Sequence, residues 1–151
     1  MKNVFFELLR RLNSWEWIPV LLARLSVGVL FFESGRGKLF YKLGELIDYF
    51  AELGIPFPHL QAAMVAAIEL AGGICLVLGF APRLLSIPLA TIMAVAILTA
   101  QLDKTKTLGD FLYLPEVLLI VILVWLVFSG PGKLALDNQI AQKLGYQSNP
   151  H

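Results

Sequence analysis

Charged residues are scarce in this sequence. Only 15% of the 151 residues are charged, whereas 58% are hydrophobic. Typical globular proteins carry roughly 25% charged residues. A soluble chain of this length could not bury so much apolar surface, because small domains leave a large fraction of their surface exposed. The composition therefore predicts a protein that is surrounded by lipid.

Cysteine and histidine are also rare. The single cysteine, Cys75, excludes an intramolecular disulfide. The two histidines, His59 and His151, are far apart, and no residues have the spacing of a haem or zinc ligand set. No metal site is predicted, so any redox chemistry would need a cofactor held without such ligands. The formal net charge of +1 argues against nucleic acid as a partner.

Long apolar runs are what the chain does contain. A membrane span needs about 20 mostly apolar residues, and the segments that qualify are 17–34, 60–80, 84–102 and 111–129. In lipid every backbone polar group must be hydrogen bonded internally, which favours helices. The sequence thus predicts an all-α membrane protein, in which four transmembrane helices form a bundle and residues 1–151 form a single domain.

The connection between the first two spans has helical periodicity of its own. Apolar residues recur at helical spacing over residues 41–53, and acidic residues lie off that stripe. The apolar residues are Leu43, Leu46, Ile47, Phe50 and Leu53. Gly54 and Pro56 then end the pattern, as they commonly do after a helix. We predict an amphipathic helix at the membrane interface.

An even number of spans places both termini on one side of the membrane. Six lysine and arginine residues fall on that side and five on the other. They are Lys2, Arg10, Arg11, Arg83, Lys133 and Lys143 against Arg36, Lys38, Lys42, Lys104 and Lys106. The positive-inside rule then favours cytoplasmic termini by a narrow margin.

Two charged residues lie inside the predicted spans. Arg24 is about 10 Å from the side that carries the termini, and Glu69 is near the middle of the second span. An ionisable residue in a span needs a partner, because a central charge costs roughly 2.5–3.5 kcal/mol. We predict a buried Arg24–Glu69 ion pair. The sequence leaves open whether this pair only holds two helices together or also serves function.

Polar residues from all four predicted spans gather at the opposite end of the bundle. The residues predicted to bind a ligand there are Glu33, Lys38, His59, Gln101, Tyr113 and Glu116. A polar vestibule with apolar walls is a common form of small-molecule site. No catalytic residue is assigned.

Four stretches of the chain resemble the DoxX family of small four-helix membrane proteins. They are "RLSVGVLFFESGRGKL", "LGIPFP", "ELAGGICLVLGFAPR" and "GPGKLALD", and they occur in this order between Arg24 and Asp137. By position, the family's recurring polar residues would be Arg24, Lys38, Glu69, Arg83 and Asp137. The resemblance implies a bacterial inner-membrane location and a link to quinone-dependent oxidoreductases.

The leading hypothesis is a subunit or partner of a quinone-linked oxidoreductase system, with a quinone or small-molecule site in the bundle. Its partners would be the lipid bilayer, oxidoreductase subunits and further copies of the chain. A structural or assembly protein of a membrane complex is the alternative. A small transporter or channel ranks third, since the chain lacks the repeated broken helices common in secondary transporters.

Overall fold

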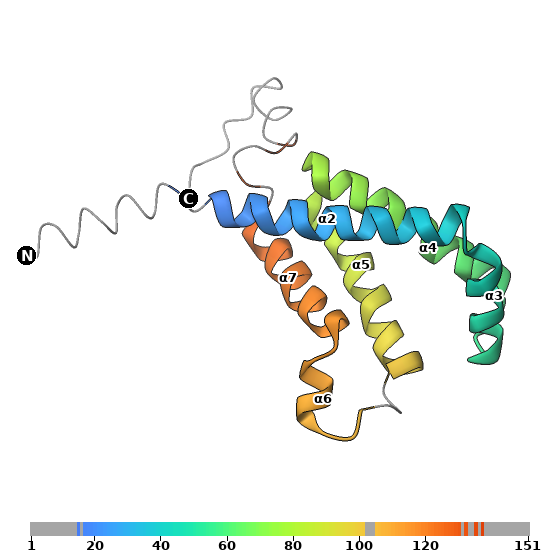
Figure 1. Cartoon of the computed structure of the whole chain (residues 1–151). Helices are drawn as coiled ribbons and strands as arrows, with labels where there is room; N and C mark the ends of the chain where they lie inside the picture. The colour runs from blue at the N-terminus through green and yellow to red at the C-terminus, as the bar shows by residue number, and fades with distance from the viewer. Residues whose placement is uncertain are drawn as a thin grey trace, which may run out of the picture.

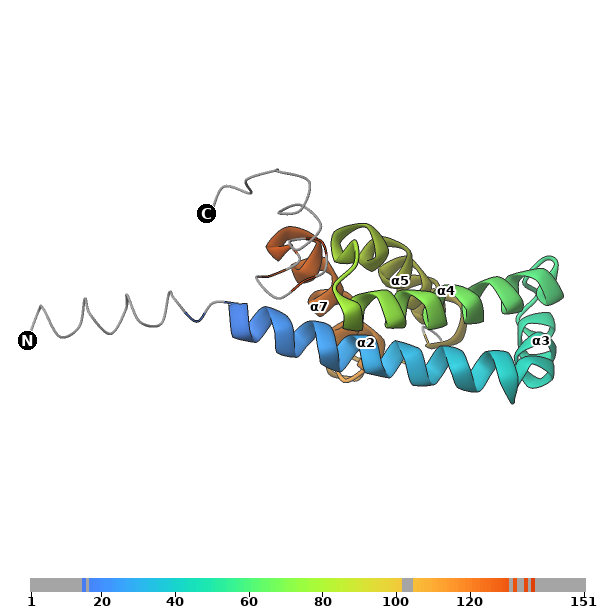
Figure 2. The same ribbon diagram turned by 90° about the horizontal axis from the view of Figure 1, so that it is seen from above.

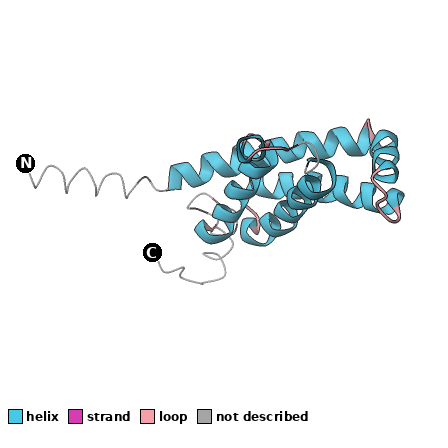
Figure 3. Cartoon of the chain, turned by 90° about the horizontal axis from the view of Figure 1, so that it is seen from below, coloured by secondary structure: helices cyan, strands magenta, loops and turns pink. Residues whose placement is uncertain are grey.

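In the part of the chain that the structure describes, the regular elements are all helices (Figure 3). The structure, a computed structural model, describes residue 15, residues 17–101 and 105–130, and residues 132, 135 and 137. The helices are α2 (Trp17–Phe40), α3 (Leu43–Glu52), α4 (Pro58–Leu78), α5 (Pro82–Ala96), the π-helical turn η1 (Ile97–Gln101), α6 (Leu108–Leu112) and α7 (Pro115–Ser129). The described residues contain no strand, which confirms the predicted all-α class.

The helices form two pairs. Helices α2 and α4 lie side by side, α5 and α7 run obliquely away from them, and α3 lies across one end of the α2–α4 pair (Figure 1). The two pairs meet around a core of large apolar side chains. This core contains Val20, Val27, Phe31, Leu76, Leu89, Met93, Leu123 and Leu126. Helices α3, α4 and α5 surround a cavity beside this core, and no side chain of α7 lines it.

Three helices of the described part are long and apolar enough to cross a membrane. They are Trp17–Phe40, Pro58–Leu78 and Pro82–Gln101, the last of which combines α5 and η1. At most 33% of the apolar 18-residue stretch in each of these helices is buried inside the protein. The remaining apolar surface points outward, as lipid-facing helices require. These helices confirm the first three predicted spans.

The fourth predicted span is not one continuous helix. Residues 111–129 are divided between the end of α6 and the 15-residue helix α7. Proline has no backbone N–H and disfavours helical geometry in the residue before it. Leu114, which precedes Pro115, is accordingly extended, with φ −66° and ψ 127°. Helix α7 is apolar but shorter than the other three, about 22 Å long at 1.5 Å per residue.

Helices α2 and α4 run side by side (Figure 2). Glycines allow them to pack closely. A Cβ atom on Gly35 would lie 2.7 Å from Leu70 Cα, and one on Gly73 would lie 2.8 Å from Gly28 O. Real side chains do not fit at such distances, so each position requires glycine. Small residues of this kind let membrane helices approach until their backbones touch. The contacts set the antiparallel register of the two helices.

Helix α3 is the amphipathic segment predicted between the first two spans. Its bounds, Leu43–Glu52, fall within the predicted range 41–53. The five residues of the predicted apolar stripe are half-buried, whereas Glu45, Asp48 and Glu52 are exposed. The apolar face of α3 therefore points toward the rest of the protein.

The glycine contacts generate a prediction for two neighbouring positions in α2. Gly35→Ala should lower the free energy of unfolding by about 1–3 kcal/mol, because the added methyl group overpacks the α2–α4 contact. Gly37→Ala is the matched control, since a Cβ there meets nothing within 4 Å. It should raise stability by up to about 1 kcal/mol through helix propensity. Thermal unfolding of both variants in detergent tests this, and equal effects would contradict it.

Candidate functional site

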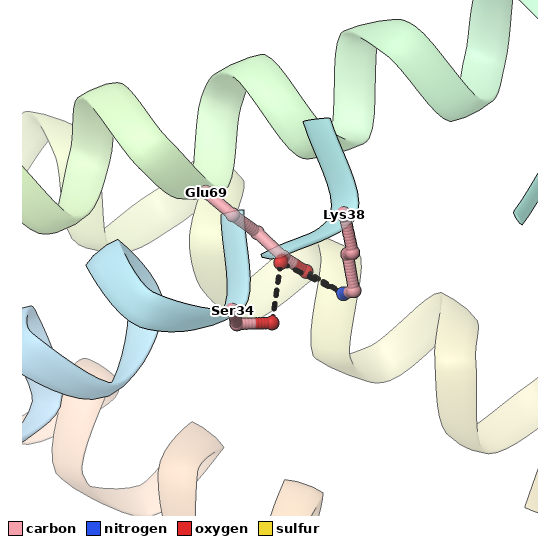
Figure 4. A network of polar contacts seen from close by, with 3 residues as sticks. All are labelled: Ser34, Lys38 and Glu69. Carbon is pink, nitrogen blue, oxygen red and sulfur yellow. Dashed lines mark hydrogen bonds and ion pairs between the residues drawn. The ribbon is translucent and has the colours of Figure 1, made fainter. Parts of the chain in front are cut away.

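A buried carboxylate and a lysine form the most tightly connected polar cluster in the described residues. Lys38 Nζ lies 2.6 Å from Glu69 Oε1 and 2.7 Å from Oε2. The Ser34 hydroxyl donates a hydrogen bond of 2.9 Å to Glu69 Oε2 (Figure 4). The side chain of Glu69 is fully buried, whereas that of Lys38 is 31% exposed. Glu69 therefore has its charge compensated inside the protein, while Lys38 extends to the edge of the cluster.

The helix register explains how this cluster forms. Ser34 and Lys38 are four residues apart on α2 and so lie on one face of that helix. Gly35 lies between them and touches the backbone of Leu70, the residue after Glu69. The close contact of the two helices thus places Glu69 directly against Ser34 and Lys38. Ser34 was not predicted as a site residue, although its spacing from Lys38 indicated a shared face.

The predicted pairing of Glu69 with Arg24 is corrected by this geometry. Arg24 is only 2% exposed, so its predicted burial is confirmed. Its guanidinium group, however, lies against Gly79 at the C-terminal end of α4, where a Cβ would be 2.8 Å from Arg24 Cζ. Gly79 follows Glu69 by ten residues in the sequence, about 15 Å along a helix. The prediction failed because depth in a span does not define which residues of two helices face each other.

Arg24 belongs instead to a cluster at the turn between α4 and α5. The two carboxylate oxygens of Asp137 accept hydrogen bonds of 2.9 and 3.1 Å from the backbone N–H of Ala81. Asp137 N–H donates a longer bond of 3.4 Å to Gly79 O. The Asp137 carboxylate also attracts the Arg24 guanidinium electrostatically. A residue beyond α7 thereby holds the turn that joins two of the spans.

A cavity of about 560 Å³ opens beside the Lys38–Glu69 pair. Its walls come from α3, α4, α5 and η1, and most lining side chains are apolar. Helix α3 contributes Leu46 and Phe50 from its apolar face, and α5 contributes Ile92 and Ala96. Volumes of about 300–1,000 Å³ are typical of small-molecule sites. The cavity is therefore large enough to hold an organic ligand.

Most polar groups in the lining already have partners within the protein. The hydroxyl groups of Thr91 and Thr99 donate to the carbonyl groups of Ile87 and Val95, one turn earlier in the same chain segment. Gln61 Nε2 likewise donates 2.9 Å to the carbonyl of Pro56. The Glu69 carboxylate is bonded to Lys38 and Ser34, so the lining side chains with polar capacity for a ligand are Lys38 and Tyr49. Such a site fits a mostly apolar molecule with one polar end.

The other residues predicted to bind a ligand do not line this cavity. Glu33 is exposed and forms a 2.7 Å ion pair with Arg36. His59 is exposed, and Tyr113 is 90% exposed. Gln101 Nε2 lies 3.4 Å from Glu116 Oε1, between η1 and α7.

The predicted convergence of these residues on one vestibule is thus corrected. Helices α5 and α7 run obliquely away from α2 and α4 (Figure 1), and of the six predicted residues Lys38 alone lines the cavity. The buried Oε2 atom of Glu116 has no hydrogen-bond partner among the residues that the structure describes. Within the described residues, no group of three or more His, Cys, Asp and Glu side chains could hold a metal ion.

A capping box starts α6, outside the three spans. The Thr107 hydroxyl accepts a hydrogen bond of 3.1 Å from Asp110 N–H, and Asp110 Oδ2 accepts one of 3.0 Å from Thr107 N–H. The side chain of Thr107, followed by the backbone N–H groups of Thr107 and Lys106, lowers the pKa of Asp110. Asp110 therefore serves as a local cap at the start of α6.

These features define a helical integral membrane protein with an apolar cavity beside a buried ion pair. The model of the DoxX family matches residues 20–102. The chain belongs to the DoxX family. No solved structure matches it.

Two relatives cover most of the chain. "Putative oxidoreductase CatD" of Bacillus subtilis (strain 168) is 33% identical over 120 residues, which are 80% of this chain and 85% of that protein. "Uncharacterized membrane protein Rv3486" of Mycobacterium tuberculosis (strain ATCC 25618 / H37Rv) is 28% identical over an alignment of 137 residues, and the match covers 82% of this chain and 82% of that protein. Both matches extend beyond the family model, so the similarity is not restricted to the first three spans.

The Lys38–Glu69 pair generates a prediction about unequal single variants. Lys38→Met should lower the free energy of unfolding by about 3–5 kcal/mol, because it leaves the buried Glu69 carboxylate uncompensated. Glu69→Gln should cost less, since Lys38 is partly exposed and can turn toward solvent. The double variant should be more stable than Lys38→Met alone. Thermal unfolding in detergent measures all three, and a double variant less stable than both single variants would contradict the pairing.

The Asp137 contacts generate a second prediction. Asp137→Ala should lower the free energy of unfolding by about 1.5–3 kcal/mol, the range for a hydrogen bond to a charged group. The matched control is Asp48→Ala on the exposed face of α3, which should stay within about 0.5 kcal/mol of the parent protein. Chemical denaturation followed by circular dichroism distinguishes the two. Equal stability of both variants would exclude a supporting role for Asp137.

Proposed function

We propose that this chain is a membrane subunit or partner of an oxidoreductase system, and that its cavity binds a quinone. The cavity beside Lys38 and Glu69 is the observation that carries the proposal. The name of the Bacillus subtilis relative, which refers to an oxidoreductase, supports the same class of function. The Lys38–Glu69 pair serves binding in this proposal, and no catalytic residue is assigned.

The lining of the cavity fits the chemistry of a quinone. A quinone ring is apolar on both faces and carries carbonyl acceptors at its edge. The walls of Leu46, Phe50, Ile92 and Ala96 suit the ring faces. Lys38 has three N–H donors, of which its two bonds to Glu69 use at most two. At least one donor is therefore left for a carbonyl of the ligand.

Each side chain of the ion pair has a distinct part in this proposal. When bound, a quinone supplies the capacity to accept or release electrons and protons. Lys38 orients the polar end of the ligand, and Glu69 holds the Lys38 ammonium group at the edge of the cavity. Ser34 fixes the second carboxylate oxygen of Glu69. Among the residues predicted to contact a headgroup, the proposal retains Lys38 as the one that lines this cavity.

The proposal also includes an arrangement in the membrane. We propose that α7 completes a four-helix bundle as a shorter fourth span and that α3 lies at the interface with its acidic face toward water. Both termini are then cytoplasmic, in the inner membrane of a bacterium. The partner would be an oxidoreductase subunit that exchanges electrons with the bound quinone, and further copies of the chain could associate through the lipid-facing helices.

A purely structural role in a membrane complex is the second candidate. It is favoured by the complete compensation of Glu69, whose two carboxylate oxygens accept three hydrogen bonds from Lys38 and Ser34. An ion pair satisfied in this way can hold α2 and α4 together without any ligand. The two candidates differ in whether the cavity is occupied in the native membrane.

A cavity-filling variant tests the proposal. Protein purified gently from its own membranes is analysed by native mass spectrometry and by extraction of bound lipids. The parent protein should carry a quinone, and Ala96→Phe, which fills the cavity wall, should lose it. Binding of an added short-chain quinone should weaken about fivefold or more, because overpacking costs about 1–3 kcal/mol.

The matched control is Ala67→Phe. Ala67 is exposed on α4 and does not line the cavity, so this variant should keep the quinone. If neither preparation contains a quinone and added quinone does not bind, the binding proposal is wrong. A stoichiometric partner protein without a bound quinone would then support the structural role.

A further inference from the structure

The cavity is open on the side where α4 and α5 are exposed. Met64 on α4 is 51% exposed and Val95 on α5 is 47% exposed, yet both line the cavity. Both helices belong to the candidate spans. A surface that is exposed on a spanning helix faces lipid. The exposed lining residues Met64 and Val95 therefore place this open side of the cavity at the lipid-facing surface.

The rim of this opening presents apolar surface despite two threonines. Thr91 and Thr99 are exposed and line the cavity one turn above and below Val95. Their hydroxyl groups are hydrogen bonded to backbone carbonyl groups of their own segment. Such back-bonding satisfies the hydroxyl groups within the helix. A hydrocarbon chain can therefore pass this rim without meeting an unsatisfied hydroxyl group.

Helix α3 covers another side of the cavity with its apolar face. Its apolar residues Leu46 and Phe50 line the cavity, whereas Glu45 and Asp48 are exposed on the other side. Figure 1 shows α3 across the end of the α2–α4 pair, away from the far ends of α5 and α7. A ligand that approached through α3 would have to separate this helix from the protein. The open rim between α4 and α5 requires no such movement.

The cavity is also longer than a single ring. Its lining on α5 and η1 runs from Pro88 to Ala100, and a helix of that extent covers about 18 Å. The polar groups are concentrated at Lys38 and Glu69. The part of the lining between Thr91 and Thr99 presents apolar surface. This distribution matches a ligand whose polar ring lies at one end and whose tail is a long hydrocarbon.

We propose that the cavity takes a quinone with a polyprenyl tail directly from the bilayer, through the rim formed by Met64, Thr91, Val95 and Thr99. This inference rests on the proposed quinone site and adds the route of entry and the place of the tail. The ring lies at Lys38, and the tail follows the lining from Thr91 on α5 to Thr99 on η1 and leaves through the rim into lipid.

Two bulky variants on α5 test the route. Val95→Trp places a large side chain in the rim, and Ile87→Trp is its matched control, since Ile87 is exposed on the same helix and does not line the cavity. Binding of a tailless benzoquinone and of its decyl-tailed analogue is measured in nanodiscs, with concentrations expressed per lipid. The fluorescence of the native tryptophans, quenched by the bound ring, supplies the signal in the parent protein, and mass spectrometry confirms occupancy in the variants.

The expected result is selective. The tailed quinone should bind the parent protein more tightly than the tailless quinone does. Val95→Trp should weaken the binding of the tailed quinone about tenfold and leave the affinity for the tailless quinone unchanged. Ile87→Trp should bind both as the parent protein does. If Val95→Trp does not fold, Met64→Trp on the other side of the rim replaces it with the same expected result.

The failure of this inference differs from the failure of the proposed function. If both quinones bind the parent protein with equal affinity and the rim variants change neither, the quinone site stands and lateral entry is wrong. If neither quinone binds the parent protein, the quinone site itself is wrong and the inference falls with it. If no quinone binds and the parent protein instead holds a phospholipid that Val95→Trp loses, the cavity is the site of a structural lipid.

Discussion

The close approach of α2 and α4 is the constraint on which the rest of the structure depends. Gly28 and Gly35 on one helix and Gly73 on the other leave no room for a side chain between the backbones. The contact therefore has one register, and that register places Glu69 against Lys38 and Ser34. Without it, the carboxylate would be buried in an apolar environment without a counter-charge, at a cost of several kcal/mol.

The ion pair in turn gives the neighbouring cavity its chemical character. The other polar side chains of the lining, apart from Tyr49, bond to their own backbone, so the wall is apolar except near Lys38. A site with a single polar end recognises a ligand by orientation as well as by size. This asymmetry favours an amphipathic ligand over a small polar one, and it links the buried charge to binding without requiring a catalytic group.

The C-terminal part of the described chain supports the same helices from the other end. Asp137 caps the turn after α4, and the Arg24 guanidinium lies against Gly79 in that turn. The α2–α4 pair thus has a polar cluster near each end, with the glycine contacts between them. Of the polar residues that the DoxX resemblance implied, Lys38 and Glu69 lie in one cluster, and Arg24 and Asp137 lie in the other.

The sequence by itself determined the helical class, the first three spans and the amphipathic helix α3. These follow from hydropathy and periodicity, because each helix in lipid must satisfy its own backbone. The burial of Arg24 and Glu69 was predictable for the same reason. The partner of Glu69, the existence of the cavity and the absence of Glu116 from its lining were decided only by the tertiary structure. Each depends on helix register and crossing direction, which result from packing over a whole interface rather than from any one segment.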